Sequence, residues 1–256
     1  MHRTQAVVLR RVDFSETSQV VHFFTLDAGK VHAIAKGAKR RKSAFIAPFD
    51  LFTVYEIVRI EKKRGELDIL TAAEVMRHFP ALRSGYERYC AACYALDITN
   101  ELTLEGVPQP DLYELLVALM EELDGGGEIA PAVFRFEVRL TSILGHLPRT
   151  AECGLCRQAI RGREAFFSCR DGGAVCMRCK PRDPRRVRIP VEVLGVLKRY
   201  GDPGSTVKLN RAWVDPLRRI LDDYIRYLAE KEPKSMKFMR KVVLGTVGPQ
   251  TAGRRP

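Results

Sequence analysis

The chain has 256 residues, of which 46% are hydrophobic and 29% charged, with a net charge of +12. This composition excludes a chain that is disordered throughout, because enough apolar surface is present to offset the conformational entropy lost on folding. No apolar run approaches the roughly 20 residues that span a bilayer, and the first residues carry arginines where a signal peptide is apolar, so we expect a cytoplasmic protein without a membrane partner.

Residues 1–80 have the pattern of short strands. Segments rich in β-branched and aromatic residues alternate with turns, and they cover 4–12, 18–25, 30–37, 51–63 and 67–75. Five strands in so short a span close most economically into a small barrel. The OB-fold is the nucleic-acid-binding version of such a barrel, and an SH3-like barrel fits the pattern nearly as well.

The loop after the third predicted strand is strongly basic. Five cations lie within eight residues with no acid among them, namely Lys36, Lys39, Arg40, Arg41 and Lys42. Cations held this close favour a phosphate backbone, whose condensed counterions they release. A solvated loop is the alternative interpretation, and we consider it the weaker one.

Two aromatic residues, Phe45 and Phe49, follow this basic loop. Exposed, they could stack on bases, whereas buried they would close the bottom of the barrel. We expect burial for Phe49 and leave Phe45 open.

From about residue 84 the apolar period becomes helical. Stripes at three-to-four spacing cover 112–123, 133–144, 193–197 and 217–228, and glycines end the first two at Gly125 and Gly145. A single apolar stripe faces a core, so we expect these helices to pack into one bundle.

Cysteine spacing gives the most specific motif. Cys153 and Cys156 form one C-x-x-C pair, and Cys176 and Cys179 form another after 19 intervening residues. Two such pairs complete a tetrahedral four-thiolate shell, which suits one structural Zn²⁺ per chain. A hairpin turning at 171–173 would bring the second pair back to the first.

The other cysteines have weaker assignments. Cys169 is a spare hairpin residue, a substitute ligand or a reactive thiol, and we favour the first. Cys90 and Cys93 lie inside a predicted helix beside tyrosines, where we expect core packing. No phosphate-binding glycine loop, metalloprotease or serine-hydrolase motif occurs, so we expect a protein that is not an enzyme and has no catalytic residues.

Several segments carry a resemblance to a known family. SETS at 15–18, AKGAKRRKS at 35–43, RGELDILTAAE at 64–74 and RFEVRLTSILGHLP at 135–148 resemble the bacterial recombination mediator family RecO. The resemblance implies an OB-fold with an appended helical domain that sometimes carries a zinc knuckle. It also implies a protein that binds single- and double-stranded DNA and anneals complementary strands. With RecR, and commonly RecF, it would help load RecA onto DNA coated by single-strand-binding protein.

We therefore expect an α+β protein, an N-terminal OB-fold β-barrel followed by an α-helical bundle domain with an inserted Cys₄ zinc knuckle. The expected organisation is a barrel at 1–80, helices at 81–150, a zinc-finger insertion at 151–189, further helices at 190–245 and a flexible tail at 246–256.

Two further surfaces complete the hypothesis. A second DNA-binding stretch follows the knuckle and contains Arg182, Arg185, Arg186 and Arg188. The acidic tail of single-strand-binding protein would dock where an apolar stripe meets cations, at Arg218, Arg219, Leu221 and Arg226.

Three alternatives stay open. One is a zinc-ribbon factor acting on RNA or in transcription. Another is a thiol-dependent enzyme using Cys169 or the pair Cys90 and Cys93. The third is a structural subunit whose basic face packs on an acidic partner.

Overall fold

The computed structural model describes the whole chain apart from residues 41–44, 46–47, 64, 180–182, 206 and 247–256. It contains two compact units, Met1–Gly127 and Glu128–Pro256. The first unit contains the barrel expected at 1–80 together with the two helices that follow it and pack against it. In the described part of the chain, no helix is long and apolar enough to cross a membrane.

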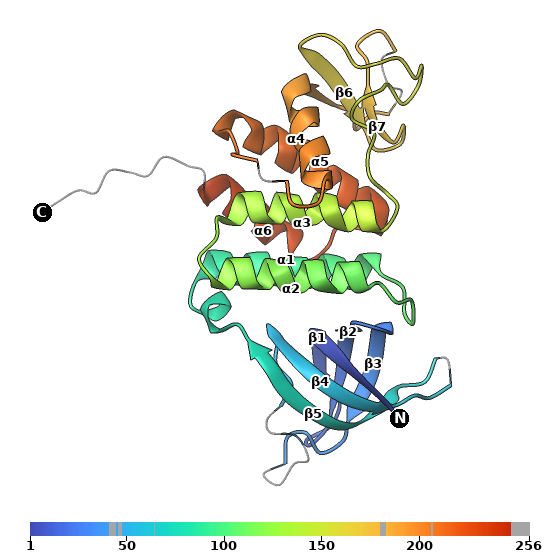
Figure 1. Cartoon of the computed structure of the whole chain (residues 1–256), viewed down its shortest axis with the longest axis vertical. Coiled ribbons are helices and arrows are strands. Elements are labelled where there is room, and N and C mark those ends of the chain that lie inside the picture. Colours follow the sequence, from blue (N-terminus) through green and yellow to red (C-terminus); the bar gives the residue numbers. More distant parts are fainter. Residues whose placement is uncertain (41–44, 46–47, 64, 180–182, 206, 247–256) are drawn as a thin grey trace, which may run out of the picture. The chain divides into compact units, whose positions relative to one another are not determined.

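The first unit is built on a closed five-stranded barrel (Figure 1). The strands are β1 (His2–Asp13), β2 (Gln19–Thr25), β3 (Gly29–Ala35), β4 (Thr53–Ile60) and β5 (Asp68–His78). Their order around the barrel is β1-β2-β3-β5-β4, with β1 pairing with β4 to close it. The β3–β5 pair is parallel and all other pairs are antiparallel. This Greek-key order is that of the OB-fold, so the first of the two expected barrels is confirmed.

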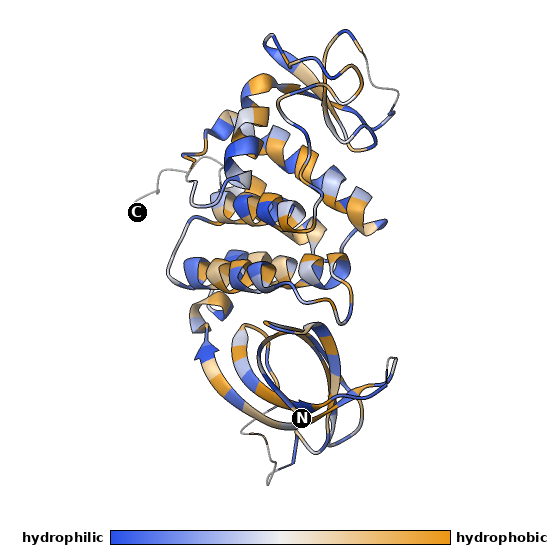
Figure 2. Cartoon of the chain, turned by 45° about the vertical axis from the view of Figure 1, so that its right-hand side comes forward, coloured by the Kyte–Doolittle hydropathy of each residue, from blue (hydrophilic) through white to orange (hydrophobic). Residues whose placement is uncertain are grey.

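Alternation along the strands fills the barrel interior. Figure 2 shows hydrophobic and hydrophilic residues alternating along the barrel strands, and in β3 the residues at 29, 31, 33 and 35 are the buried ones. The ring of Phe49 contacts three other rings in the core, those of Phe23, Phe45 and Tyr55, at centroid distances of 5.1–5.5 Å. The expected burial of Phe49 is confirmed, and Phe45 is also buried.

Two helices and a short 3-10 turn complete the first unit. They are η1 (Pro80–Arg83), α1 (Tyr86–Leu102) and α2 (Pro110–Asp124). The chain before α2 lies directly against the β2–β3 turn. Glycine at position 29 permits this contact, because its φ is +65° and a Cβ there would lie 1.9 Å from the carbonyl oxygen of Val107. As expected, Cys90 is buried within α1, and Cys93 is half-buried.

The described residues of the second unit form four helices and a small sheet. The helices are α3 (Ile129–Ile143), α4 (Val191–Gly201), α5 (Arg211–Ala229) and α6 (Met236–Thr246). Between α3 and α4 lies the three-stranded sheet β7-β6-β8, formed by β6 (Glu164–Ser168), β7 (Gly173–Val175) and β8 (Val187–Pro190). The β6–β7 hairpin turns where the sequence predicted, with Ser168 opposite Gly173.

A buried charge network joins three helices of this unit. Arg218 of α5 donates to both carboxylate oxygens of Glu137 of α3, at 2.6 and 3.2 Å. Its Nε lies 2.8 Å from Asp222, whose other oxygen accepts from Arg240 of α6. Arg218 and Glu137 are 1% and 0% exposed, so this cation belongs to the core.

The expected docking site for an acidic tail is therefore wrong at two residues. Arg218 is neutralised inside the helical core, and Leu221 is 1% exposed, so neither side chain can receive a partner. Arg219 is exposed, while Arg226 is half-buried and bridged to Asp223 and Glu232.

Candidate nucleic-acid interface and metal centre

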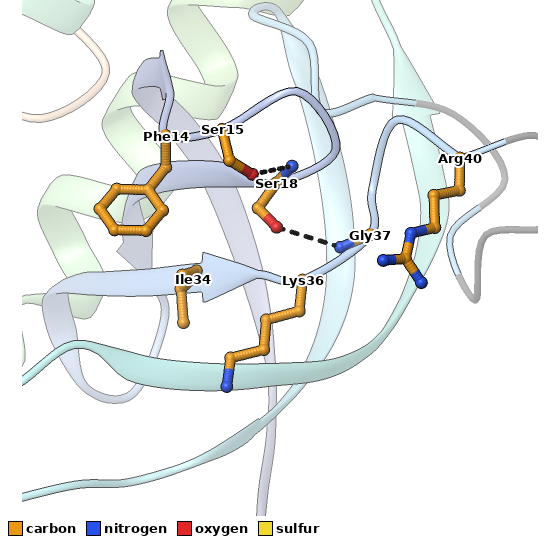
Figure 3. A pocket seen from close by; sticks show the side chains of 7 residues that line it. All are labelled: Phe14, Ser15, Ser18, Ile34, Lys36, Gly37 and Arg40. Atoms are coloured by element: carbon orange, nitrogen blue, oxygen red, sulfur yellow. Dashed lines mark hydrogen bonds between the residues drawn. The ribbon is translucent and has the colours of Figure 1, made fainter.

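A pocket of about 410 Å³ opens on the barrel where two loops meet (Figure 3). The β1–β2 loop contributes Phe14, Ser15 and Ser18, whereas the end of β3 and the following turn contribute Ile34, Lys36, Gly37 and Arg40. Of the expected DNA-binding residues, Lys36 and Arg40 thus line one pocket.

Backbone and side-chain hydrogen bonds hold the two loops together. The amide of Gly37 donates to Ser18 Oγ at 3.3 Å, and the amide of Lys39 donates to the carbonyl of Thr17 at 3.0 Å. Gly37 has φ +71°, a conformation that L side chains rarely adopt, and the amide of Arg40 closes the turn onto its carbonyl. The pocket wall is therefore fixed without any ligand.

The three described cations of the basic loop are not equivalent. Lys39 Nζ lies 2.9 Å from the carboxylate of Asp13, at the end of β1, and this hydrogen bond lowers the pKa of that carboxyl. Among the described residues, no carboxylate pairs with Lys36 or Arg40. The other two expected residues, Arg41 and Lys42, lie outside the described residues. Lys36 and Arg40 are thus the cations most available to an anion.

The exposed aromatic residue of this region is not one of the two that the sequence suggested. Phe45 and Phe49 are buried in the barrel, whereas Phe14 is 66% exposed at the pocket edge. An aromatic side chain in the polar turn DFSET was the available signal, since a turn between strands has no core in which to bury a ring.

The second basic stretch is partly neutralised. Arg185, Arg186 and Arg188 are all exposed. Arg188 is bridged to Glu164, and Arg186 lies over the ring of Phe166 at 5.9 Å while donating to a backbone carbonyl. Arg185 lines a separate pocket of about 540 Å³ with residues of α5. The expected Arg182 lies outside the described residues.

The four cysteines of the two C-x-x-C pairs come together as the sequence predicted. The sulfur atoms of Cys153, Cys156, Cys176 and Cys179 all lie within 4.8 Å of one another. Two of them, from Cys156 and Cys176, are 3.9 Å apart. A tetrahedral shell with Zn–S bonds of about 2.3 Å has edges of about 3.8 Å, so the cluster has the dimensions of a four-thiolate site.

The backbone around the cluster favours the thiolate form of Cys153. Burial opposes ionisation of Cys153, but amide N–H groups, including those of Cys156 and Cys176, outweigh it and lower the pKa of this thiol to about 6. Gly154 allows the close approach of the two loops, because a Cβ there would lie 2.3 Å from the carbonyl oxygen of Asp171. The residues present therefore fit a tetrahedral metal ion without an open position.

Two of the remaining cysteines, Cys169 and Cys93, lack the ionisation of a nucleophile. Cys169 is not part of the sulfur cluster, and burial, followed by the nearby charge of Asp223, raises its pKa to about 12. Burial likewise raises the pKa of Cys93 to about 11. Because the thiolate is the reactive form, neither thiol is poised for catalysis near neutral pH.

Comparison with known proteins decides the family. Residues 1–79 match the family model described as Recombination protein O N terminal, and residues 83–237 match Recombination protein O C terminal. The chain belongs to the RecO family of DNA repair proteins.

Named members of the RecO family align along most of the chain. The DNA repair protein RecO of Rhodopirellula baltica is 35% identical over 208 residues, covering 79% of this chain and 77% of that protein. That of Anaeromyxobacter sp. strain K is 32% identical over 213 residues, or 83% and 84% of the two chains. That of Halalkalibacterium halodurans is 29% identical over 242 residues, or 93% and 94%. The expected resemblance is thereby confirmed over both the barrel and the helical region.

Proposed function

We propose that this RecO-family chain is a DNA-binding recombination mediator. It binds single- and double-stranded DNA, anneals complementary strands and, with RecR and RecF, helps load RecA onto DNA coated by single-strand-binding protein. The observation that carries the proposal is a preformed pocket on an OB-fold barrel, with two cations that no described carboxylate neutralises, in a chain whose named relatives are DNA repair proteins.

Binding relies on charge rather than base sequence. Lys36 and Arg40 contact phosphates, with Arg41 and Lys42 as further contacts of the same loop, and Lys39 contributes less because Asp13 already neutralises it. Arg185 and Arg186, with Arg188 held by Glu164, give the second unit its own cationic surface for contact with phosphates. Two strands bound to cationic surfaces of one protein repel each other less, so base pairing nucleates without nucleotide hydrolysis.

One structural Zn²⁺ per chain is part of the proposal. Cys153, Cys156, Cys176 and Cys179 would hold the ion, which ties the β6–β7 hairpin to the chain that precedes it and leaves no coordination position for chemistry. The protein then acts without a catalytic residue of its own.

The surface proposed for partner docking is narrower than the four residues that the sequence indicated. Since Arg218 and Leu221 are buried, the acidic tail of single-strand-binding protein would contact Arg219 and Arg226. Of these, Arg226 must exchange its contacts with Asp223 and Glu232 for the new carboxylates.

Annealing of complementary oligonucleotides tests the proposed function. The wild-type chain is expected to accelerate annealing of both naked strands and strands coated by single-strand-binding protein. The variant Lys36→Ala/Arg40→Ala should lose most of this acceleration, whereas Lys198→Ala/Arg199→Ala, which removes two exposed cations from α4, should keep it. A wild-type chain that leaves annealing at the spontaneous rate would contradict the proposal.

A further inference from the structure

Phe14 is an exposed aromatic side chain that is not part of the barrel core. It is 66% exposed, whereas the other phenylalanines of the barrel region, Phe23, Phe24, Phe45, Phe49 and Phe52, are at most 6% exposed. A single exposed apolar residue is common on protein surfaces and needs no explanation by itself. Its setting is what distinguishes Phe14.

That setting is a built pocket with two kinds of lining. Phe14 and Ile34 are its apolar members, while Lys36 and Arg40 are its cations (Figure 3). Across the sheet, Ile34 of β3 lies opposite Val20 of β2, and Val20 lies opposite Val12 of β1. Val12 is itself 43% exposed. An apolar surface thus runs alongside the cations instead of being mixed with them.

The lining is also one-sided in charge. None of the described lining residues is acidic: of the two carboxylates nearby in the chain, that of Asp13 is bound to Lys39 and that of Glu16 is exposed and does not line the pocket. The site therefore fits a ligand that is flat and apolar on one side and anionic on the other. An unpaired nucleotide has this chemistry, since its base offers a π-face and its phosphate carries the charge.

We propose that Phe14 stacks on an unpaired base of single-stranded DNA while Lys36 and Arg40 hold the adjoining phosphates. The inference rests on the proposed DNA-binding function and deepens it. In a duplex both faces of each base are covered by neighbouring pairs, so the ring finds a partner only on a single strand. The subsite would thereby make the barrel prefer single strands over duplexes without reading sequence.

Three labelled nucleic acids test the stacking contact by fluorescence anisotropy: oligo(dT), an abasic strand of the same length, and a blunt duplex. Phe14→Ala is expected to weaken binding of oligo(dT) about 5-fold or more, the usual loss for one stacked base, and to leave the other two unchanged. The matched control is Phe238→Ala, which removes an exposed ring from α6 of the second unit and should change none of the three.

A conservative variant reports the contact directly. Phe14→Trp in a Trp213→Phe background keeps the ring and leaves one indole in the chain. Oligo(dT) is expected to quench its fluorescence and to bind with affinity close to wild type, whereas the abasic strand should bind without quenching. Because Phe14 is mostly exposed, Phe14→Ala should melt at the temperature of the wild type, and Phe14→Trp/Trp213→Phe should melt at the temperature of Trp213→Phe alone.

Different experimental outcomes would contradict the stacking contact and the proposed function. Wild-type chain that binds none of the three nucleic acids would overturn both. Wild-type chain that binds oligo(dT) no better than Phe14→Ala does, or a Phe14→Ala loss of equal size on all three nucleic acids, would overturn only the stacking contact and leave charge-driven binding in place.

Discussion

At the scale of single residues, Arg218 and Arg219 show how strongly burial can differ between neighbouring positions of one helix. Both are arginines of α5 beside an apolar stripe, yet one is 1% exposed and the other lies on the surface. Position 218 stands three residues before Leu221 and seven before Ile225, so it falls on the buried face of the helix. Its partner Glu137 is 81 residues away in the chain, and only the fold reveals that pairing.

Removing this buried cation should be costly. Arg218→Ala leaves the Glu137 carboxylate buried without its bidentate partner, so we expect the free energy of unfolding to fall by about 3–5 kcal/mol. Arg219→Ala, one residue away and exposed, should change it by no more than about 0.5 kcal/mol. Urea denaturation followed by circular dichroism compares the two, and equal midpoints for both variants would show that the network adds nothing to stability.

A pair of histidines makes the barrel sensitive to acid. His22 and His32 lie opposite one another on β2 and β3 with ring centroids 4.0 Å apart. Burial, followed by the charges of His32, Arg10 and Lys30, lowers the pKa of His22 to about 4. Since the unfolded chain binds this proton near pH 6.5 and the folded chain does not, stability is full above that pH and declines as the pH falls towards 4.

The variant His22→Gln should therefore lose less stability between pH 7 and pH 5 than the wild type does. His32 also has a lowered pKa, caused first by burial, so some acid dependence should remain. Urea midpoints measured at both pH values provide the comparison, and parallel pH profiles for the two proteins would argue against the histidine pair.

At the scale of elements, local sequence patterns predicted most of the strands and helices but not strand β8 or the full lining of the pocket. Runs of β-branched and aromatic residues between turns located all five barrel strands, the 3.6-residue period located α2, α3, α4 and α5, and the turn at 171–173 located the β6–β7 hairpin. Strand β8 was missed because its four residues are too few for a period to show. The pocket was half found: the basic run marked one wall, but Phe14 comes from another loop that only strand pairing brings alongside.

The cysteine cluster at the β6–β7 hairpin should bind one zinc ion through all four of its thiolates. Purified chain is expected to contain one zinc ion, and Cys176→Ser/Cys179→Ser should contain none, because two ligands cannot complete the shell. Cys169→Ser is the matched control and should keep the ion. Elemental analysis together with thiol titration measures the zinc content of both variants. Equal zinc content in the two would refute the four-cysteine assignment.

At the scale of the whole molecule, charge is distributed by segment. Residues 81–150 carry a net charge of −6, whereas the segments before and after them are basic, so the excess of cations falls on the barrel and on the part that follows residue 150. Each compact unit thus has its own basic surface: Lys36 and Arg40 in the first, and Arg185 and Arg186 in the second. Under the proposed function, these two surfaces would let the protein hold two nucleic-acid segments at once.

The salt dependence of single-stranded DNA binding tests the central claim most directly. The logarithm of the association constant should fall linearly with the logarithm of salt concentration. Lys36→Ala/Arg40→Ala should weaken binding and flatten that slope by about 1.4, or about 0.7 for each phosphate that the variant no longer neutralises. Lys198→Ala/Arg199→Ala, with the same net charge, should keep the wild-type slope. If Lys36→Ala/Arg40→Ala kept both the wild-type affinity and the wild-type slope, the barrel pocket would not be where this protein holds DNA.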